Sequence, residues 1–139
     1  RLRVASRTEI HEALIGCGIP HRGREDHNGN RAEIALVQAK AIGIRRLGSV
    51  TLELAYLAAG RLDAFWERNL KLGLGFWERG LHPWDLAAGI LLVREAGGFT
   101  SDCDGEASPM QTGNIIAANA DLLPQLKKEL AAARKITGA

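Results

Sequence analysis

Short apolar runs alternate with longer amphipathic segments along the 139-residue chain. Runs in which apolar side chains alternate with polar ones, or stand together over a few positions, are typical of strands. Segments with an apolar residue every three or four positions are typical of helices. By these patterns we expect strands at Leu2–Ala5, Leu14–Ile19, Ile44–Leu47, Leu62–Glu67, Phe99–Ser101 and Asn114–Ala118.

The first two expected helices have recognisable start and stop signals. The first is predicted to open at Asn30, because Asn30 and Glu33 have the spacing of an N-cap and its capping-box partner. It is predicted to stop near Gly43, a residue type common just after a helix. Gly48-Ser49 is predicted to cap the second helix, which should end at Gly60.

The third expected helix, Trp84–Ala96, is apolar on nearly every side, so we expect it to be buried. Gly97-Gly98 should end it, and Asp121 should cap a last amphipathic helix. Strands that alternate with helices predict a layered α/β domain with a mixed, mostly parallel sheet flanked by helices. The length suits one such domain.

One tetrapeptide is repeated. Phe65-Trp66-Glu67-Arg68 recurs as Phe76-Trp77-Glu78-Arg79, eleven residues later. A single repeat of this kind indicates a local duplication and not a solenoid. Two arrangements are open. Either the first copy forms the expected strand and the residues after it bulge out, or the second copy forms the strand and the bulge falls earlier.

Composition and charge exclude several classes of protein. The longest apolar run, Leu86–Val93, is far shorter than the roughly 20 residues of a transmembrane helix, and no secretory signal is apparent. A net charge of +2 does not favour a nucleic-acid partner. Cys17 and Cys103 form no metal-binding pair and are expected to be reduced thiols of a cytoplasmic protein. Because the chain starts at Arg1 inside a strand-like pattern and without Met, we expect a fragment of a longer protein.

Asp85 is the first candidate for chemistry. It follows Pro83-Trp84 in the first turn of the third expected helix, where a carboxylate interacts favourably with the helix dipole. That position suits an ordinary N-terminal acid as well as an active-site acid. Glu78, seven residues earlier, would share a cleft with Asp85 if the intervening loop folds back, and would otherwise be a surface acid.

A family resemblance separates these interpretations. Trp84-Asp85-Leu86-Ala87-Ala88-Gly89, followed by Leu92-Val93-Arg94-Glu95-Ala96-Gly97-Gly98, resembles the C-terminal signature of the inositol monophosphatase family. Arg46-Leu47-Gly48-Ser49 before it and Gly113-Asn114-Ile115-Ile116-Ala117-Ala118-Asn119 after it are similar to the family in the same order. The resemblance covers essentially the whole chain. It implies the C-terminal lobe of a layered α/β phosphatase fold, with the N-terminal metal-binding lobe absent.

The resemblance also implies roles for single residues in a Mg²⁺-dependent phosphatase. It implies that Asp85 is a metal ligand that also contacts substrate hydroxyls. Glu78 would bind hydroxyls of a sugar or inositol, and Gly48 and Ser49 would line the substrate pocket. Ser49 stands where the family more often has Thr, and it keeps the hydroxyl. Because the family's spacing to Asp85 fits Glu78 and not Glu67, we favour the second repeat copy as the strand.

The chain departs more seriously from the family in its metal-binding residues. The family's D-P-x-D-G-T segment and its upstream metal-binding Glu have no counterpart in the sequence. Asp102-Cys103-Asp104-Gly105 comes nearest but has the wrong spacing, and we interpret it as a turn. One carboxylate cannot hold a pair of metal ions. We therefore expect no complete catalytic set and no phosphate release by this chain alone.

The resemblance implies a small phosphorylated polyol as substrate, such as inositol monophosphate. Histidinol phosphate, fructose bisphosphate and nucleotide phosphates are alternatives that Glu78, Gly48 and Ser49 do not separate. A rival from another class is a non-catalytic protein-interaction fragment, since some bacterial members of the family bind the transcription machinery. Without its other lobe the chain should expose an apolar face and form a homodimer through it.

Overall fold

The computed structural model describes residues 1–19, 27–68 and 83–138, and these residues contain a five-stranded sheet in the order β2-β1-β3-β5-β4. The β1–β2 and β1–β3 pairs are parallel, whereas the β3–β5 and β4–β5 pairs are antiparallel. The predicted mixed sheet is therefore confirmed, with as many antiparallel as parallel pairs among these strands. Its strands are β1 (Leu14–Cys17), β2 (Gly43–Arg45), β3 (Ala64–Glu67), β4 (Phe99–Ser101) and β5 (Ile115–Ala118).

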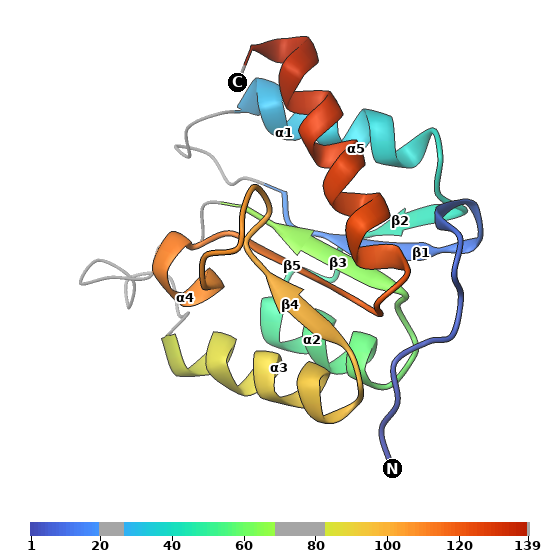
Figure 1. Ribbon diagram of the computed structural model, residues 1–139, viewed down its shortest axis with the longest axis vertical. Helices are drawn as coiled ribbons and strands as arrows, with labels where there is room; N and C mark the ends of the chain where they lie inside the picture. The colour runs from blue at the N-terminus through green and yellow to red at the C-terminus, as the bar shows by residue number, and fades with distance from the viewer. Residues whose placement is uncertain (20–26, 69–82, 139) are drawn as a thin grey trace.

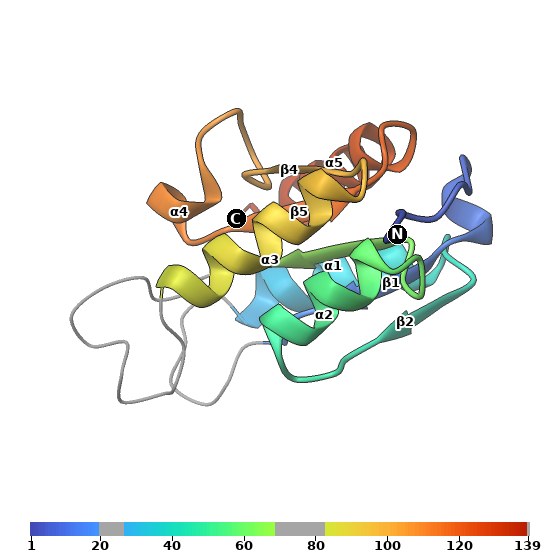
Figure 2. The same cartoon turned by 90° about the horizontal axis from the view of Figure 1, so that it is seen from below.

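Helices cover both faces of the sheet, as Figures 1 and 2 show. Helices α1 (His27–Gln38) and α5 (Leu122–Thr137) pack together on one face. Helices α2 (Val50–Ala58) and α3 (Pro83–Glu95) pack together on the other. This arrangement confirms the predicted layered α/β fold. Two short helices, η1 (Ile10–Glu12) and α4 (Pro109–Thr112), lie in connections.

Strand β3 shows how the two hydrophobic cores arise. All four of its residues are buried, because helices cover both faces of the sheet. Phe65 belongs to the core under α2 and α3, whereas its neighbours Ala64 and Trp66 belong to the core under α1 and α5. Successive side chains of a strand point to opposite faces, so one strand contributes to both cores.

The N-terminal segment is not part of the sheet, so the strand expected at Leu2–Ala5 is wrong. The Val4 amide instead donates a hydrogen bond to the carbonyl of Ala96 at the end of α3. Of the two apolar side chains that gave the alternating pattern, Val4 packs against the core. Leu2 is 45% exposed.

Helix α1 differs from its prediction at both ends. It begins at His27 and ends at Gln38, so the expected N-cap at Asn30 and the stop near Gly43 are both wrong. Asn30 is buried within the helix. Gly43 is already the first residue of β2, where it pairs with Leu14 of β1. The helix therefore ends before Gly43, because this residue belongs to the sheet.

Helix α2 has the caps that the sequence predicts. The Ser49 hydroxyl accepts a hydrogen bond from the Leu52 amide at 3.3 Å, and Gly60 follows the helix with φ of 72°. At α5 the predicted position is right but the predicted chemistry is not. Asp121 stands before the helix, yet the side chain of Asn119 accepts the hydrogen bond from the Leu122 amide.

Helix α3 lies where the sequence predicts it, but it is buried on one face only. Leu86, Ile90 and Val93 pack into the core, whereas Trp84 is 65% exposed and Leu91 is 60% exposed. The expectation of burial on every side is therefore wrong. The buried face meets α2 and the sheet, and within the described part of the chain the opposite face remains open to solvent.

Residues 65–67 of the first repeat copy lie in strand β3, so the preference for the second copy is wrong. Asp63 fixes this register. Its carboxylate accepts a hydrogen bond from the Leu14 amide at 2.7 Å, and its own amide donates to the Leu14 carbonyl at 2.8 Å. These two bonds place the residues that follow Asp63 beside β1. The second copy, residues 76–79, lies outside the described residues.

Candidate active site

The candidate site lies at the edge of the sheet where strands β1 and β3 end and helices α2 and α3 begin. Strands β1 and β3 are parallel, so both end at this edge. Helices α2 and α3 lie side by side, run in the same direction and start from it (Figures 1 and 2). Ligand sites of α/β sheets commonly lie at such an edge, because strand ends and helix N-termini converge there.

The loop before α2 contributes Gly48 and Ser49. Gly48 has φ of 81°, a left-handed conformation that favours glycine. No described heavy atom lies within 4 Å of the position that a Cβ would take on Gly48, so the backbone is open on this side. A ligand can therefore approach the main chain closely. The Ser49 hydroxyl accepts from the Leu52 amide and can still donate to a ligand.

The backbone of Asp85 lies in the first turn of α3. Helix α3 approaches α2 closely at Gly89, where an added Cβ would overlap Leu54 Cδ1 and come within 3.0 Å of Leu54 Cβ. Asp85 lies one turn before Gly89 in α3, and Val50 lies one turn before Leu54 in α2. The predicted residues Ser49 and Asp85 therefore belong to neighbouring helix starts.

Glu78, the remaining predicted site residue, lies between residues 69 and 82 and thus outside the described residues. The structure therefore brings Gly48, Ser49 and the Asp85 backbone to one edge of the sheet. The part of the site that Glu78 would form stays a prediction.

Sequence reasoning missed a buried carboxyl beside this loop. Glu53 in α2 is 1% exposed and accepts a hydrogen bond from the Leu47 amide at 3.2 Å. Burial raises its pKa to about 7; the Leu47 hydrogen bond and Arg46 lower the pKa, while Glu67 raises it further. A signal was present, because Glu53 interrupts the otherwise apolar stripe of Val50, Leu54 and Leu57.

A second carboxylate, that of Glu67 at the end of β3, faces the same edge. Glu67 is buried, and a Cβ on Gly18 would overlap its Cγ and Cδ atoms. Its side chain therefore lies over the end of β1. The crowding at Gly18 explains why a residue without a side chain follows that strand.

The two thiols are not nucleophiles at neutral pH. Burial raises the pKa of Cys17 to about 12, and Glu53 and Glu67 contribute to the same shift. Burial also raises the pKa of Cys103 to about 12. Both cysteines are free, as the sequence predicts. Since the thiolate is the reactive form, neither side chain fits covalent catalysis.

The segment from Asp102 to Gly105 is a turn, as predicted. The Asp102 carboxylate accepts hydrogen bonds from the amides of Asp104 and Gly105 at 2.7 and 2.9 Å. The Asp104 carboxylate pairs with the guanidinium of Arg68. These carboxylates are thus engaged in holding the turn. In the part of the chain that the structure describes, no three His, Cys, Asp or Glu side chains form a group that could hold a metal ion.

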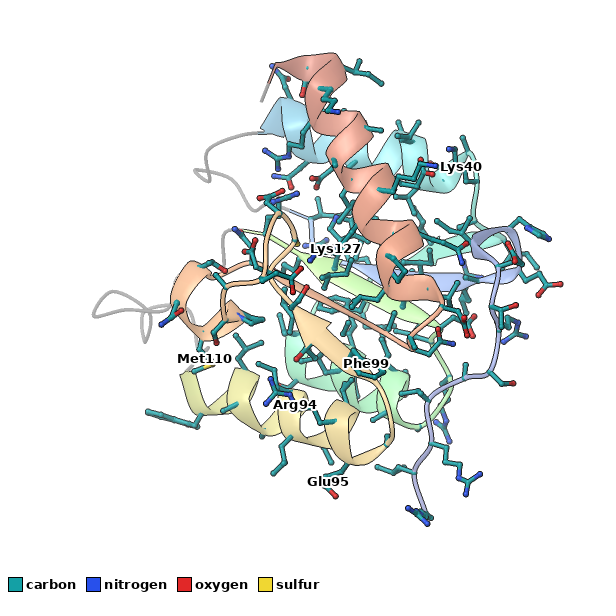
Figure 3. The ribbon with its side chains drawn as sticks, in the orientation of Figure 1. Lys40, Arg94, Glu95, Phe99, Met110 and Lys127 are labelled. Atoms are coloured by element: carbon teal, nitrogen blue, oxygen red, sulfur yellow. The ribbon has the colours of Figure 1, made fainter. Side chains whose placement is uncertain are left out.

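A hollow of about 440 Å³ lies at the opposite end of α3. Arg94, Phe99 and Thr100 line it together with Gly97 and Gly98. Figure 3 shows Arg94 and Phe99 near the turn from α3 to β4. This hollow is separate from the candidate site, because Asp85 and Arg94 stand at opposite ends of the helix. None of the helices in the described ranges has the length and apolar character needed to cross a bilayer.

Comparison with known proteins identifies relatives of this chain. The chain is 48% identical over 136 residues to a protein of Mesorhizobium japonicum named inositol-1-monophosphatase. That match covers 95% of this chain and 47% of the relative. The chain is also 45% identical over 122 residues to the Nus factor SuhB of Pseudomonas aeruginosa, covering 86% of this chain and 41% of that protein. The chain thus spans about half the length of the curated relatives it matches.

Solved structures show the same fold. The crystal structure of the extragenic suppressor protein suhB from Bartonella henselae matches with a TM-score of 0.81 at 42% identity, over 94% of this chain and 46% of that one. The inositol monophosphatase of Anabaena sp. matches with a TM-score of 0.78 at 33% identity, over 94% of this chain and 50% of that chain. The family model described as the inositol monophosphatase family matches residues 1–138. This chain therefore belongs to the inositol monophosphatase family.

Proposed function

We propose that the chain is the C-terminal half of a cytoplasmic, Mg²⁺-dependent phosphomonoesterase that acts on a small polyol phosphate such as inositol monophosphate. One observation carries the proposal. The open backbone at Gly48, the Ser49 hydroxyl and the first turn of α3 with Asp85 all belong to one edge of the sheet. The name of the Mesorhizobium relative, inositol-1-monophosphatase, supports the choice of substrate class.

Each residue has a proposed task. Asp85 supplies a carboxylate oxygen to the metal and orients the substrate hydroxyl beside it. Gly48 and Ser49 bind the polyol through the open main chain and the hydroxyl. Glu78 accepts hydrogen bonds from polyol hydroxyls. When bound, Mg²⁺ activates a water molecule and neutralises the phosphate oxygens.

The donor set fits magnesium only in part. Carboxylate oxygen is the ligand type that Mg²⁺ prefers, and Asp85 offers one such group. The described residues contain no group of three ligands, so the proposal assigns the remaining ligands to an upstream half of the protein. It follows that this chain needs that half for turnover.

The proposal is tested with two proteins. The first is this chain alone, and the second is a chimaera in which the chain replaces the matching 136 residues of the Mesorhizobium relative. With inositol 1-phosphate and Mg²⁺, the chimaera should release phosphate, EDTA should stop the release, and the chain alone should release none. Turnover by the pure chain, or a folded chimaera without activity, would contradict the proposal. Histidinol phosphate, fructose bisphosphate and nucleotide phosphates should each give a lower kcat/KM.

A second candidate function is a non-catalytic protein interaction. The observation that favours it is the 45% identity to a relative named Nus factor SuhB. The two functions differ in their need for Asp85. If the chimaera replaces the Pseudomonas relative in its own cells, Asp85→Asn should abolish that replacement under the enzymatic account. Full replacement by the Asp85→Asn protein would favour the interaction account.

We also propose that the isolated chain forms a homodimer through the outer face of α3. Trp84 and Leu91 lie on this face seven residues apart, which places them on one side of the helix, and both are largely exposed. An exposed apolar face favours self-association. Light scattering after size exclusion should give a dimer for the wild type and for Ile136→Glu, and a monomer for Leu91→Glu. Ile136 is the control because it is 75% exposed on α5, across the sheet. A monomeric wild type would contradict the proposal.

A further inference from the structure

Strand β4 is an edge strand of the sheet, and β5 is its single neighbour among the described strands. Figures 1 and 2 show it as the outermost strand on its side. An edge strand presents backbone N–H and C=O groups that can pair with another chain, and proteins commonly protect such edges with charged residues or proline. Strand β4, Phe99-Thr100-Ser101, contains neither. Its outer side is therefore open to pairing.

The strand at the other edge of the sheet, β2, is protected by a charge. It ends with the exposed residue Arg45, whose guanidinium donates a hydrogen bond to the Ile44 carbonyl of the same strand at 3.0 Å. A charged residue at this place disfavours the addition of a further strand. The two edges of the sheet therefore differ, and within the described part of the chain β4 is the unprotected one.

The hollow of about 440 Å³ lies beside β4 and contains a cationic group. Arg94 of α3 lines it together with Phe99 and Thr100 of β4. Figure 3 shows Arg94 between α3 and β4. No ion pair or side-chain hydrogen bond joins Arg94 to another described residue. Because a guanidinium pairs strongly with a carboxylate, the hollow favours an acidic group.

The two side chains of β4 that line the hollow point to opposite faces of the sheet. Thr100 is paired with Ala117, which belongs to the core under α2 and α3, so its side chain points towards α3. Its hydroxyl oxygen is buried and has no hydrogen-bond partner among the described atoms, which is uncommon for a buried polar group. Phe99 points to the other face and is 51% exposed. An acceptor group in the hollow would satisfy Thr100, and an apolar group beyond the edge would cover Phe99.

We propose that β4 and the hollow bind an extended acidic peptide segment of a partner protein by strand addition. The backbone of the segment pairs with the open side of β4. A glutamate of the segment enters the hollow and accepts hydrogen bonds from Arg94 and Thr100, and its apolar neighbours in sequence lie over Phe99. Strand addition gains affinity from main-chain hydrogen bonds and specificity from pockets for alternate side chains. The inference goes beyond the proposed function and does not depend on hydrolysis.

The test is an NMR titration of the ¹⁵N-labelled 139-residue chain with the peptide acetyl-Thr-Val-Glu-Val-Thr-amide. The amide shifts of Phe99, Thr100 and Ser101 should change together and saturate, with a dissociation constant of about 1 mM or lower. The same peptide with Gln in place of Glu should bind at least about five-fold more weakly, because it loses a charge-assisted hydrogen bond. N-acetylglutamate amide, which has the acidic side chain without a strand, should bind more weakly still.

Charge reversal separates recognition by Arg94 from a general effect on the fold. Arg94 is exposed, so Arg94→Glu should leave the spectrum that of a folded protein. This variant should lose the glutamate peptide and bind the peptide with Lys in place of Glu. The matched control is Arg45→Glu, an exposed arginine of the other edge strand, and it should bind the glutamate peptide like the wild type.

Four results would overturn the inference. They are the absence of saturable shifts in β4, shifts centred on another element, equal affinity for the Glu and Gln peptides, and no exchange of preference in Arg94→Glu. N-acetylglutamate amide that binds as tightly as the peptide would show a pocket for small anions and would contradict strand addition. The fluorescein-labelled peptide should also bind the chimaera. Loss of binding there would show that the upstream half covers β4, and would contradict docking of a partner at this edge.

Discussion

Burial is the largest cause of the raised pKa values of both cysteines. The pKa values of Cys17 and Cys103 are raised to about 12, so only about one thiol in ten thousand is ionised at pH 8. We predict that a thiol-specific reagent such as 5,5′-dithiobis(2-nitrobenzoic acid) labels neither cysteine within minutes in the native protein. Both should react at once in urea. Stoichiometric labelling of the native chain would show that a thiol is accessible and ionisable.

The raised pKa of Glu53 predicts that the stability of the folded chain depends on pH. The pKa of Glu53 is about 7 in the folded state and has the ordinary value of 4.5 in the unfolded state. Between these two pH values Glu53 keeps its proton in the folded state and loses it in the unfolded state. The free energy of unfolding should therefore fall by about 2 kcal/mol from pH 5 to pH 8 on account of this group. Urea denaturation should show that Glu53→Gln lacks this part of the decline. Parallel pH profiles for the two proteins would contradict the raised pKa.

Single residues also mark the limit of what the sequence predicts about the site. Asp85, Gly48 and Ser49 belong to motifs contiguous in the chain, so their roles could be proposed from sequence. Glu53 could have been noticed as a charge within an apolar stripe. Its raised pKa could not be predicted, because it depends on burial against β1 and on Glu67 from another strand.

At the scale of elements, the spacing between α2 and α3 depends on Gly89. An added side chain would overlap Leu54, which is fully buried, so Gly89→Val should force the helices apart. We predict a loss of about 1–3 kcal/mol in the free energy of unfolding. Ala88→Val is the matched control, because Ala88 is the adjacent, exposed residue of the same helix. Equal urea midpoints for the two variants would contradict this packing.

The hydrophobic periodicity predicted which helices and strands exist. It predicted less well which faces they bury and which strands pair. Helix α3 was predicted from its apolar pattern, yet the pattern could not show that one apolar face stays exposed. The two repeat copies have the same pattern, so sequence alone could not decide between them. The decision comes from Asp63, whose bonds to Leu14 lie 49 residues away in the chain. The N-terminal segment alternates like a strand, but it pairs with none of the strands in the described residues.

For the whole molecule, two observations point to the same conclusion. The chain spans about half of its relatives, and α3 exposes apolar side chains on its outer face. A layered fold usually covers such a face with a further layer. We propose that, in a full-length enzyme, an upstream half both completes the metal site and covers this apolar face of α3.

The most direct measurement is phosphate release from inositol 1-phosphate by the chimaera with and without Asp85→Asn, at saturating Mg²⁺. Because Asp85 is the proposed metal ligand, the substitution should lower kcat/KM by about 100-fold or more. Glu95→Gln is the control, since Glu95 is an exposed acid at the far end of the same helix, and it should keep the parental rate. An Asp85→Asn chimaera that releases phosphate at the parental rate would contradict the central claim.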